Sequence, residues 1–145
     1  MWGEVRSPSW THLSASAAVG APTITLSETV NWKVNDEIVI YSTDFSQDQA
    51  EVRTITSVNN GNEISFAEPL EALHYSDVIH GVTMRAPVAL LTRDILIRGA
   101  ADDSADGYGV HVMARGAFSE FYMQAVEVFR GGQRGVLGRY PFHVH

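Results

Sequence analysis

The sequence predicts an all-β protein in which a small antiparallel sandwich or barrel leads into the stacked coils of a β-solenoid. Short runs of apolar and β-branched residues alternate with polar ones, and glycine, asparagine and proline separate the runs. No stretch of about 11 residues or more holds a helical period. The 145 residues suffice for one domain, or for one domain and part of another.

Antiparallel strands are expected in residues 1–85. They cover residues 23–26, 37–41, 51–58 and 63–66. Between the last two runs, Asn59-Asn60-Gly61-Asn62 predicts a tight hairpin turn, because asparagine and glycine tolerate positive φ. Residues 1–85 are therefore predicted to form the amino-terminal sandwich or barrel.

The pattern changes after Pro87, and residues 86–145 are predicted to form the first coils of the solenoid. The expected strands are short and separated by glycine-rich turns; they cover residues 88–91, 94–98, 110–113, 120–129 and 140–145. Arg134 and Arg139 flank two of the glycines and are interpreted as turn residues. A continued antiparallel sandwich would give a similar pattern and stays open as the alternative.

The strand pattern continues to His145, and a solenoid with an open end exposes unpaired backbone groups. The chain is therefore expected to be a fragment of a longer protein. The rest of its own chain would then be one partner, and isolated copies could self-associate through the open end of the β-helix.

Charge and composition exclude several classes of protein. The net charge is −7, and the surplus lies in residues 1–85, where four cations face eleven acids. Because no basic patch is visible, nucleic acid is not an expected partner. No apolar run reaches the roughly 18 residues of a membrane span. Without cysteine, the chain can hold neither a disulfide nor a thiolate metal site.

Three histidines are candidate metal ligands. His143 and His145 are two residues apart in an expected strand, so they point to the same face, while Phe142 and Val144 are expected to fill the coil interior. By the same rule His111 points outward. If the two strands lie in neighbouring coils, three imidazoles converge, as a zinc site with an open position requires. Surface histidines that bind nothing remain the alternative.

Acidic residues near an arginine form a second candidate site. Arg93 and Asp94 follow an apolar run, and Asp102, Asp103 and Asp106 follow Gly99. Carboxylates held close to one another and to a guanidinium can perform acid–base chemistry on a glycosidic bond. The same aspartates could bind calcium or simply form turns in a solvated loop.

Three stretches carry a pattern that points to a known family. Residues 32–40 read WKVNDEIVI, residues 88–95 read VALLTRDI, and residues 132–145 hold GQRG followed by GRYPFHVH. The chain resembles, over residues 10–145, the eight-glycine domain and parallel β-helix of fibrocystin, fibrocystin-like proteins and the related cell-surface and secreted hyaluronidases. Asn35 stands where the family usually has glycine, but asparagine can adopt the same positive φ.

The resemblance implies an ectodomain fragment that is extracellular or at the cell surface, with a β-sandwich leading into a right-handed parallel β-helix. The hyaluronidase members also imply roles for individual residues. Substrate binding or catalysis would fall to Arg93, Asp102 and Asp103, and a divalent metal ion, zinc or calcium, to His111, His143 and His145.

Three functions are open from the sequence. The first is a non-catalytic extracellular module for scaffolding or adhesion that could bind a polysaccharide or glycoconjugate. The second is a metal-assisted, glycosidase-type depolymerase of hyaluronan-like polysaccharide, and the third is a self-assembling surface or filament subunit. Cleavage of a long anionic chain favours a basic groove, so the acidic net charge favours the first.

Overall fold

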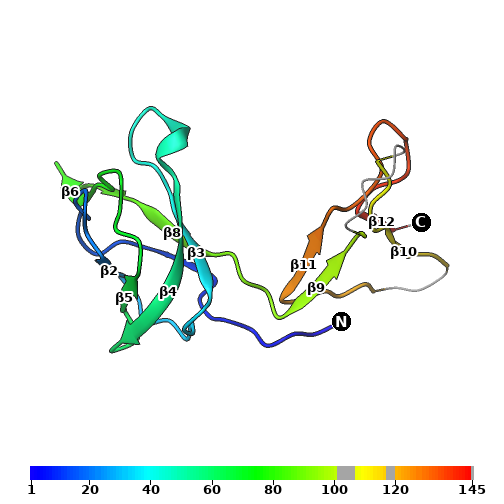
Figure 1. Ribbon diagram of the computed structural model, residues 1–145, viewed down its shortest axis with the longest axis horizontal. Helices are drawn as coiled ribbons and strands as arrows, with labels where there is room; N and C mark the ends of the chain where they lie inside the picture. Colours follow the sequence, from blue (N-terminus) through cyan, green and yellow to red (C-terminus); the bar gives the residue numbers. More distant parts are fainter. Residues whose placement is uncertain (101–106, 117–119, 145) are drawn as a thin grey trace. The chain divides into compact units, whose positions relative to one another are not determined.

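The computed structural model describes residues 1–100, 107–116 and 120–144, which form two units (Figure 1). The barrel unit holds Arg6–Thr92, and the coil unit holds Met1–Val5 together with Arg93–His145. This division differs from the expected one at residues 85 and 86. The apolar run after Pro87 forms β8 (Pro87–Leu90), which pairs with strands of the barrel and does not begin the solenoid.

The barrel unit is built on one antiparallel sheet with the strand order β1-β8-β3-β4-β5-β2. Besides β8, its strands are β1 (Trp10–His12), β2 (Thr23–Thr25), β3 (Glu37–Ile40), β4 (Glu51–Asn59) and β5 (Glu63–Phe66). Leu13, just after β1, forms an antiparallel bridge with Leu26, just after β2. Because this bridge joins the two outer strands, the sheet closes into a barrel, the second of the two predicted forms.

Apolar side chains from β2, β3, β4, β5 and β8, together with Leu13 just after β1, fill the barrel. Leu13, Ile38 and Ile64 are among those fully shielded from solvent. The alternation predicted for residues 51–58 is present in β4, where Glu51, Arg53 and Ile55 are buried and their neighbours Val52 and Thr54 are exposed. The alternation therefore identified the inward face, although two of its residues are charged.

Two turns have the backbone conformation that their residues predict. Asn60 and Gly61 both have positive φ, of 52° and 73°, and the Asn62 N–H donates to the Asn59 carbonyl at 3.2 Å, as in a hairpin turn between β4 and β5. Asn35 also has positive φ, of 73°, and the next residue, Asp36, accepts a hydrogen bond from the Lys33 N–H at 2.8 Å.

A second hairpin in the barrel unit was not predicted. It consists of β6 (Ser76–Ile79) and β7 (Val82–Arg85), which pair only with each other, and His80 and Gly81 form its positive-φ turn. A short 3₁₀ helix, η1 (Gln47–Gln49), is the single helical segment in the part of the chain that the structure describes. The all-β class is therefore confirmed, and the described residues include no helix that could cross a membrane.

The coil unit differs from the barrel unit in that its strands pair in parallel. β9 (Ile95–Arg98) pairs with β11 (Val126–Phe129), and β10 (Val112–Ala114) pairs with β12 (Phe142–Val144). About 30 residues separate the partners, so each pair joins successive coils of a β-helix-like fold. This confirms the solenoid and excludes the continued antiparallel sandwich for these strands.

The predicted coil interior is not closed around β12. Phe142 is 42% exposed and Val144 is 62% exposed, whereas His143 between them is half-buried. The sheet of β10 and β12 has two strands among the described residues, so no further described strand covers Phe142, whereas the stacked His111 ring covers one face of His143. The prediction that Phe142 and Val144 are interior residues is wrong for this chain.

Buried charges join β4 to the loop that closes one side of the barrel. Glu51, Arg53 and His74 are all buried, and His74 is fully shielded from solvent. Glu51 pairs with Arg53 through Oε2 and with the His74 ring through Oε1, at 2.9 Å from Nε2. The other ring nitrogen of His74, Nδ1, lies 2.9 Å from the Tyr41 carbonyl oxygen.

The surroundings of Glu51 favour its charged form. Burial by itself raises the pKa of the Glu51 carboxyl, but stabilisation of the carboxylate outweighs this effect and holds the pKa below its ordinary value of 4.5. In decreasing order, the stabilising groups are the Glu71 N–H, the His74 ring, the Ala72 N–H and the Arg53 guanidinium.

The barrel unit should therefore lose stability in acid. Above pH 4.5 the Glu51 carboxylate contributes fully; as the pH falls below 4.5 the unfolded chain takes up the proton first, and the free energy of unfolding falls until the folded pKa is passed. Glu51→Gln should lower this free energy by about 3 to 5 kcal/mol at neutral pH, because it leaves Arg53 and His74 without their carboxylate. Denaturant unfolding between pH 3 and pH 7 measures both effects.

Glu63→Gln is the matched control, because Glu63 is an exposed glutamate on the neighbouring strand β5. It should change the free energy of unfolding little and keep the slope below pH 4.5. An equal slope in wild type and Glu51→Gln would contradict the assignment of acid sensitivity to Glu51.

Candidate functional site

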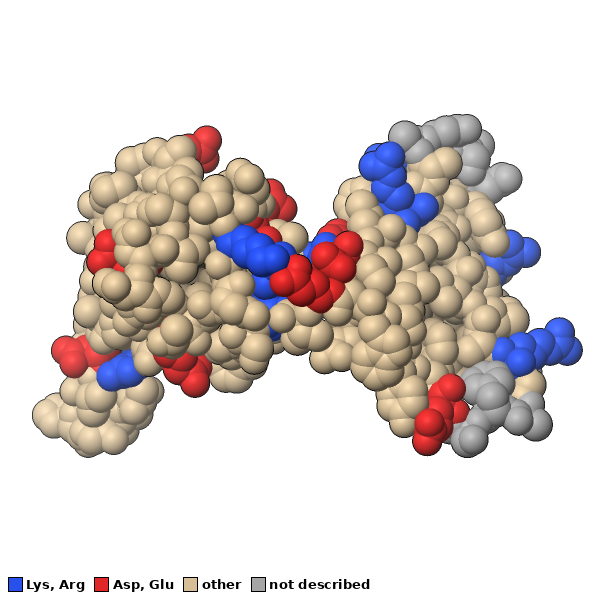
Figure 2. All heavy atoms as spheres, turned by 90° about the horizontal axis from the view of Figure 1, so that it is seen from below, with Lys and Arg blue, Asp and Glu red and all other residues tan. Residues whose placement is uncertain are grey.

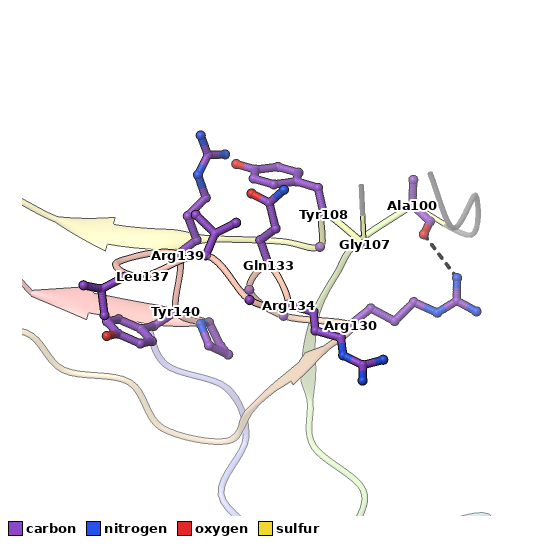
Figure 3. Close-up of a pocket in the computed structure, with 15 residues that line it drawn as sticks. Ala100, Gly107, Tyr108, Arg130, Gln133, Arg134, Leu137, Arg139 and Tyr140 are labelled. Atoms are coloured by element: carbon purple, nitrogen blue, oxygen red, sulfur yellow. Dashed lines mark hydrogen bonds between the residues drawn. The ribbon is translucent and has the colours of Figure 1, made fainter. Parts of the chain in front are cut away.

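The coil unit contains a groove of about 660 Å³ between the turns that connect its strands (Figure 3). Its polar and aromatic side chains come from the segment before β10 and from the long turn between β11 and β12. We call it the arginine groove, after the side chains that define it: Tyr108, Arg130, Gln133, Arg134, Arg139 and Tyr140.

Glycines form the floor of the arginine groove, because two backbone segments approach each other there. The Gly109 N–H donates to the Gly132 carbonyl at 2.7 Å, and the Val110 N–H donates to the Arg130 carbonyl at 2.9 Å. A Cβ on Gly109 would overlap the Arg130 carbonyl oxygen. A Cβ on Gly131 would lie 2.7 Å from the Pro141 side chain. Glycine is therefore required at both positions by close approach.

Two of the three arginines in the groove are held by identified neighbours. The Arg139 guanidinium lies over the Tyr108 ring, 5.0 Å from its centroid. Arg130 donates from a guanidinium nitrogen to the Ala100 carbonyl at 3.2 Å. In Figure 3 Arg139, Gln133 and Tyr108 extend to one side of the groove, and Arg130 and Arg134 extend to another. The cations are therefore spread along the groove.

The groove carries positive charge in a chain that is acidic overall. None of the described residues that line it is an aspartate or a glutamate. Arginine takes the place of lysine throughout the coil unit, since Lys33, the single lysine, lies in the barrel unit. On the face in Figure 2 the arginines of the coil unit are separated by uncharged surface. The net charge thus conceals a local cationic site.

The barrel unit has a second cavity, of about 530 Å³, with the opposite charge. Asp44, Asp48, Glu51 and Glu71 all line it, and no described lining residue is a lysine or an arginine. Anions would be repelled from this cavity, so the two cavities are suited to different ligands.

Two of the three predicted metal ligands lie together. The rings of His111 and His143 stack, with centroids 5.9 Å apart and planes 16° apart, because β10 and β12 pair in parallel. His143 Nδ1 lies 2.8 Å from the Gly138 carbonyl oxygen, which can only accept a hydrogen bond. A neutral His143 therefore carries its proton on Nδ1 and its lone pair on Nε2. Tyr140, in the wall of the arginine groove, contacts the His143 ring edge-on.

The histidine pair fits part of a zinc site. Nε2 of His111 is buried and has no hydrogen-bond partner among the described residues, and a carbonyl that orients the other histidine is a usual companion of a metal ligand. A catalytic zinc ion takes three protein ligands. The described residues contain no group of three histidines, cysteines or carboxylates able to hold a metal, and His145 lies outside them. Two imidazoles do not suit calcium, which prefers oxygen ligands.

Of the other predicted site residues, the structure describes Arg93. Arg93 is half-buried before the start of β9, whereas Ala100, after the end of that strand, borders the arginine groove. The strand β9 separates the two residues, so Arg93 and Ala100 lie at opposite ends of this strand. Asp102 and Asp103 lie outside the described residues.

Sequence analysis missed the groove itself. The sequence pattern favours turns at Arg134 and Arg139, and it gives no binding role to Tyr108, Arg130 or Tyr140. The usable signal was the composition of residues 130–140, which hold three arginines and four glycines but no acid. Such a segment combines close backbone approach with guanidinium groups.

The glycine floor gives a direct test of the groove. Gly109→Ala should force Arg130 away from Val110 and destabilise the coil unit by about 1 to 3 kcal/mol, as overpacking does. Amide exchange should then speed up at Val110 and Gly132, whose N–H groups cross the close approach. In Gly135→Ala, the control, the new methyl meets open space, and only the positive φ of 75° is strained. Unchanged protection at Val110 in Gly109→Ala would show that the segments are not in close contact.

The chain is similar to several known proteins over most of its length. The CEMIP beta-helix family matches residues 107–145, which include the arginine groove and both described histidines. A G8 domain-containing protein of Dictyostelium discoideum is 37% identical over 94% of this chain. The human cell surface hyaluronidase CEMIP2 is 35% identical over 83% of it, and a cell surface hyaluronidase of Danio rerio is 34% identical over 79%.

The chain spans only 12%, 10% and 9% of the lengths of these three relatives. Among solved structures, the tailspike protein gp49 of Pseudomonas phage LKA1 has a TM-score of 0.43 and 20% identity over 61% of this chain and 16% of its own. The expected likeness to fibrocystin stays a prediction. The chain is therefore similar to the CEMIP beta-helix family over residues 107–145, and to G8 domain-containing and CEMIP2 proteins over most of its own length.

Proposed function

We propose that the chain is an extracellular, non-catalytic β-helix module that binds acidic polysaccharide in the arginine groove. One observation carries the proposal. Three guanidinium groups and two phenol rings line a cavity of about 660 Å³ whose described residues include no acid. Ligand pockets commonly have volumes of about 300 to 1,000 Å³, so the groove has room for a few sugar rings.

The chemistry of the groove suits sugars that carry a carboxylate. A guanidinium group is planar and can donate two parallel hydrogen bonds to one carboxylate. The Tyr108 ring beneath Arg139 supports that guanidinium, which lowers the entropy lost when it binds. Tyr140 adds an aromatic surface on which the C–H face of a sugar ring can rest.

The relatives support this choice of ligand and compartment. Two of them are named as cell surface hyaluronidases, and hyaluronan is a polymer that contains a carboxylate sugar. Binding without cleavage is proposed because the described lining of the arginine groove holds cations and no carboxylate, whereas cleavage of a glycosidic bond commonly uses a pair of carboxylates. The activity of the much longer relatives is not extended to this chain.

Metal-assisted cleavage of the polysaccharide is the second candidate function. The stacked His111 and His143 favour it, together with the edge-on contact from Tyr140, which links the pair to the groove wall. In this function the two imidazoles, and His145 as a third, would hold a zinc ion next to the bound sugar. The ion would supply Lewis-acid chemistry, and the arginines would position the substrate.

Binding should depend on the arginines. Arg134→Ala and Arg139→Ala should each weaken the binding of a hyaluronan octasaccharide by about tenfold, the loss expected for a hydrogen bond between charged groups. The affinity of the wild type should fall as salt rises, because exposed charges are screened. Isothermal titration calorimetry at two salt concentrations measures both effects.

Arg98→Ala is the matched control, because Arg98 is an exposed arginine of β9 in the same unit and does not line the groove. It should change the affinity less than about twofold. Equal losses in Arg98→Ala and Arg139→Ala would show that the polymer senses net charge and does not occupy the groove.

The metal-assisted candidate has its own test. Titration with zinc should release heat in the wild type, and His111→Ala and His143→Ala should each remove most of it. Protons compete for the imidazole nitrogens, so the affinity for zinc should fall as the pH is lowered. His80→Ala, which changes an exposed histidine of the barrel unit, should bind zinc as the wild type does. Zinc binding that survives in the His111→Ala, His143→Ala double variant would remove this candidate.

A further inference from the structure

A stacked pair of aromatic rings stands on the surface of the coil unit. Trp2 and Tyr122 have ring centroids 5.9 Å apart and planes inclined by 22°. Both rings are mostly in solvent, with Trp2 68% exposed and Tyr122 54% exposed. We call the two side chains the aromatic platform. Neither the Trp2 indole N–H nor the Tyr122 hydroxyl makes a hydrogen bond to the described residues.

The backbone beneath the aromatic platform is held in place. Trp2 forms a parallel bridge with Gln124; the Gly3 N–H donates to the Gln124 carbonyl at 3.1 Å, and the Gln124 N–H donates to the Met1 carbonyl at 3.2 Å. The Glu4 N–H donates to the Asp94 carboxylate at 2.9 Å. A Cβ on Gly3 would lie 2.9 Å from both the Ala125 carbonyl and the Asp94 side chain. The platform is therefore preorganised, and little entropy is lost when a ligand binds.

We infer that the aromatic platform binds the C–H face of an uncharged pyranose ring, as a polysaccharide subsite separate from the arginine groove. A pyranose has an apolar C–H face and a rim of hydroxyl groups. The platform presents the complementary pattern, with an apolar ring face and polar N–H and O–H groups at its edge. The choice of a sugar as ligand rests on the proposed function, whereas the site rests on Trp2 and Tyr122.

Charge and area distinguish this ligand from others. The charges on the supporting segments are mixed, with acidic Glu4 and Asp94 beside the Met1 amino group, so the platform lacks the cluster of cations that a nucleic acid or an acidic polymer requires. A stable protein interface buries about 1,200 to 2,000 Å² in total, and two aromatic side chains provide only about 150 to 250 Å² each. A single sugar ring matches this smaller area.

The platform and the arginine groove lie at different ends of the coil unit. In Figure 1 the amino-terminal segment runs along the lower side of β9 and β11, and the turn between β11 and β12 lies at the upper side. A polymer could therefore engage each site without the other, and the two sites can be tested independently.

The test uses the full chain and two neutral probes, hexasaccharides of β-1,4-linked glucose and of β-1,4-linked N-acetylglucosamine, followed by isothermal titration calorimetry. We expect at least one probe to bind with an affinity that salt does not change. Trp2→Ala and Tyr122→Ala should each weaken that binding by about tenfold, whereas Trp2→Phe and Tyr122→Phe, which keep an aromatic ring, should stay within about threefold of the wild type.

Trp10→Ala is the matched control, because Trp10 is a similarly exposed tryptophan, 56% in solvent, that contacts His12 edge-on and has no parallel aromatic partner. It should leave the affinity for the neutral probe unchanged. Circular dichroism and thermal unfolding should match the wild type in every variant, since the platform is exposed. Arg139→Ala should bind the hyaluronan octasaccharide about tenfold more weakly and the neutral probe as the wild type does, which separates failure of the groove from failure of the platform.

Three results would overturn the inference. The first is that neither probe binds to the wild type at millimolar concentration. The second is that Trp10→Ala weakens binding as much as Trp2→Ala does. The third is that the wild type sediments as a dimer and Trp2→Ala as a monomer, which would make the platform a contact between copies of the chain.

Discussion

Close approach of two backbone segments determines the shape of the coil unit. Gly109 lies against the Arg130 carbonyl so closely that no side chain fits between them. The turn after β11 must therefore run directly beside the segment before β10, with Gly131 and Gly132 under Pro141. Because backbone occupies the floor, the long side chains of the turn can only extend outward, and three of them are arginines. The groove thus follows from one steric constraint, and its charge follows from the arginines that the turn carries.

In the barrel unit, a small sheet closes around charged residues as well as apolar ones. The Leu13–Leu26 bridge joins the outer strands, and apolar side chains fill the interior. β4 nevertheless directs Glu51 and Arg53 inward, where His74 and the N–H groups of Glu71 and Ala72 satisfy the carboxylate. Such a network links β4 to its covering loop, and it stabilises the fold only while the carboxylate stays charged.

The net charge of −7 does not reveal that acids and cations concentrate in different units of the chain. The acids concentrate in the barrel unit, where four of them border one cavity, while the described lining of the arginine groove has cations only. This separation explains how an acidic chain can be proposed to bind an acidic polymer, since local charge governs contact at a groove. An acidic net charge therefore does not exclude a basic groove in this chain.

Local chemistry in the sequence determined four strands of the barrel, β2 to β5, the positive-φ turn at Asn60 and Gly61, and the all-β class, because alternation and turn residues act over a few positions. It also identified His111 and His143, which the parallel pairing of β10 and β12 brings together. The tertiary structure alone decided that β8 joins the barrel, that Trp2 pairs beside Gln124, and that Tyr108 lies under Arg139. These contacts join residues about 30 to 120 positions apart, and their register depends on loops whose paths no local period encodes.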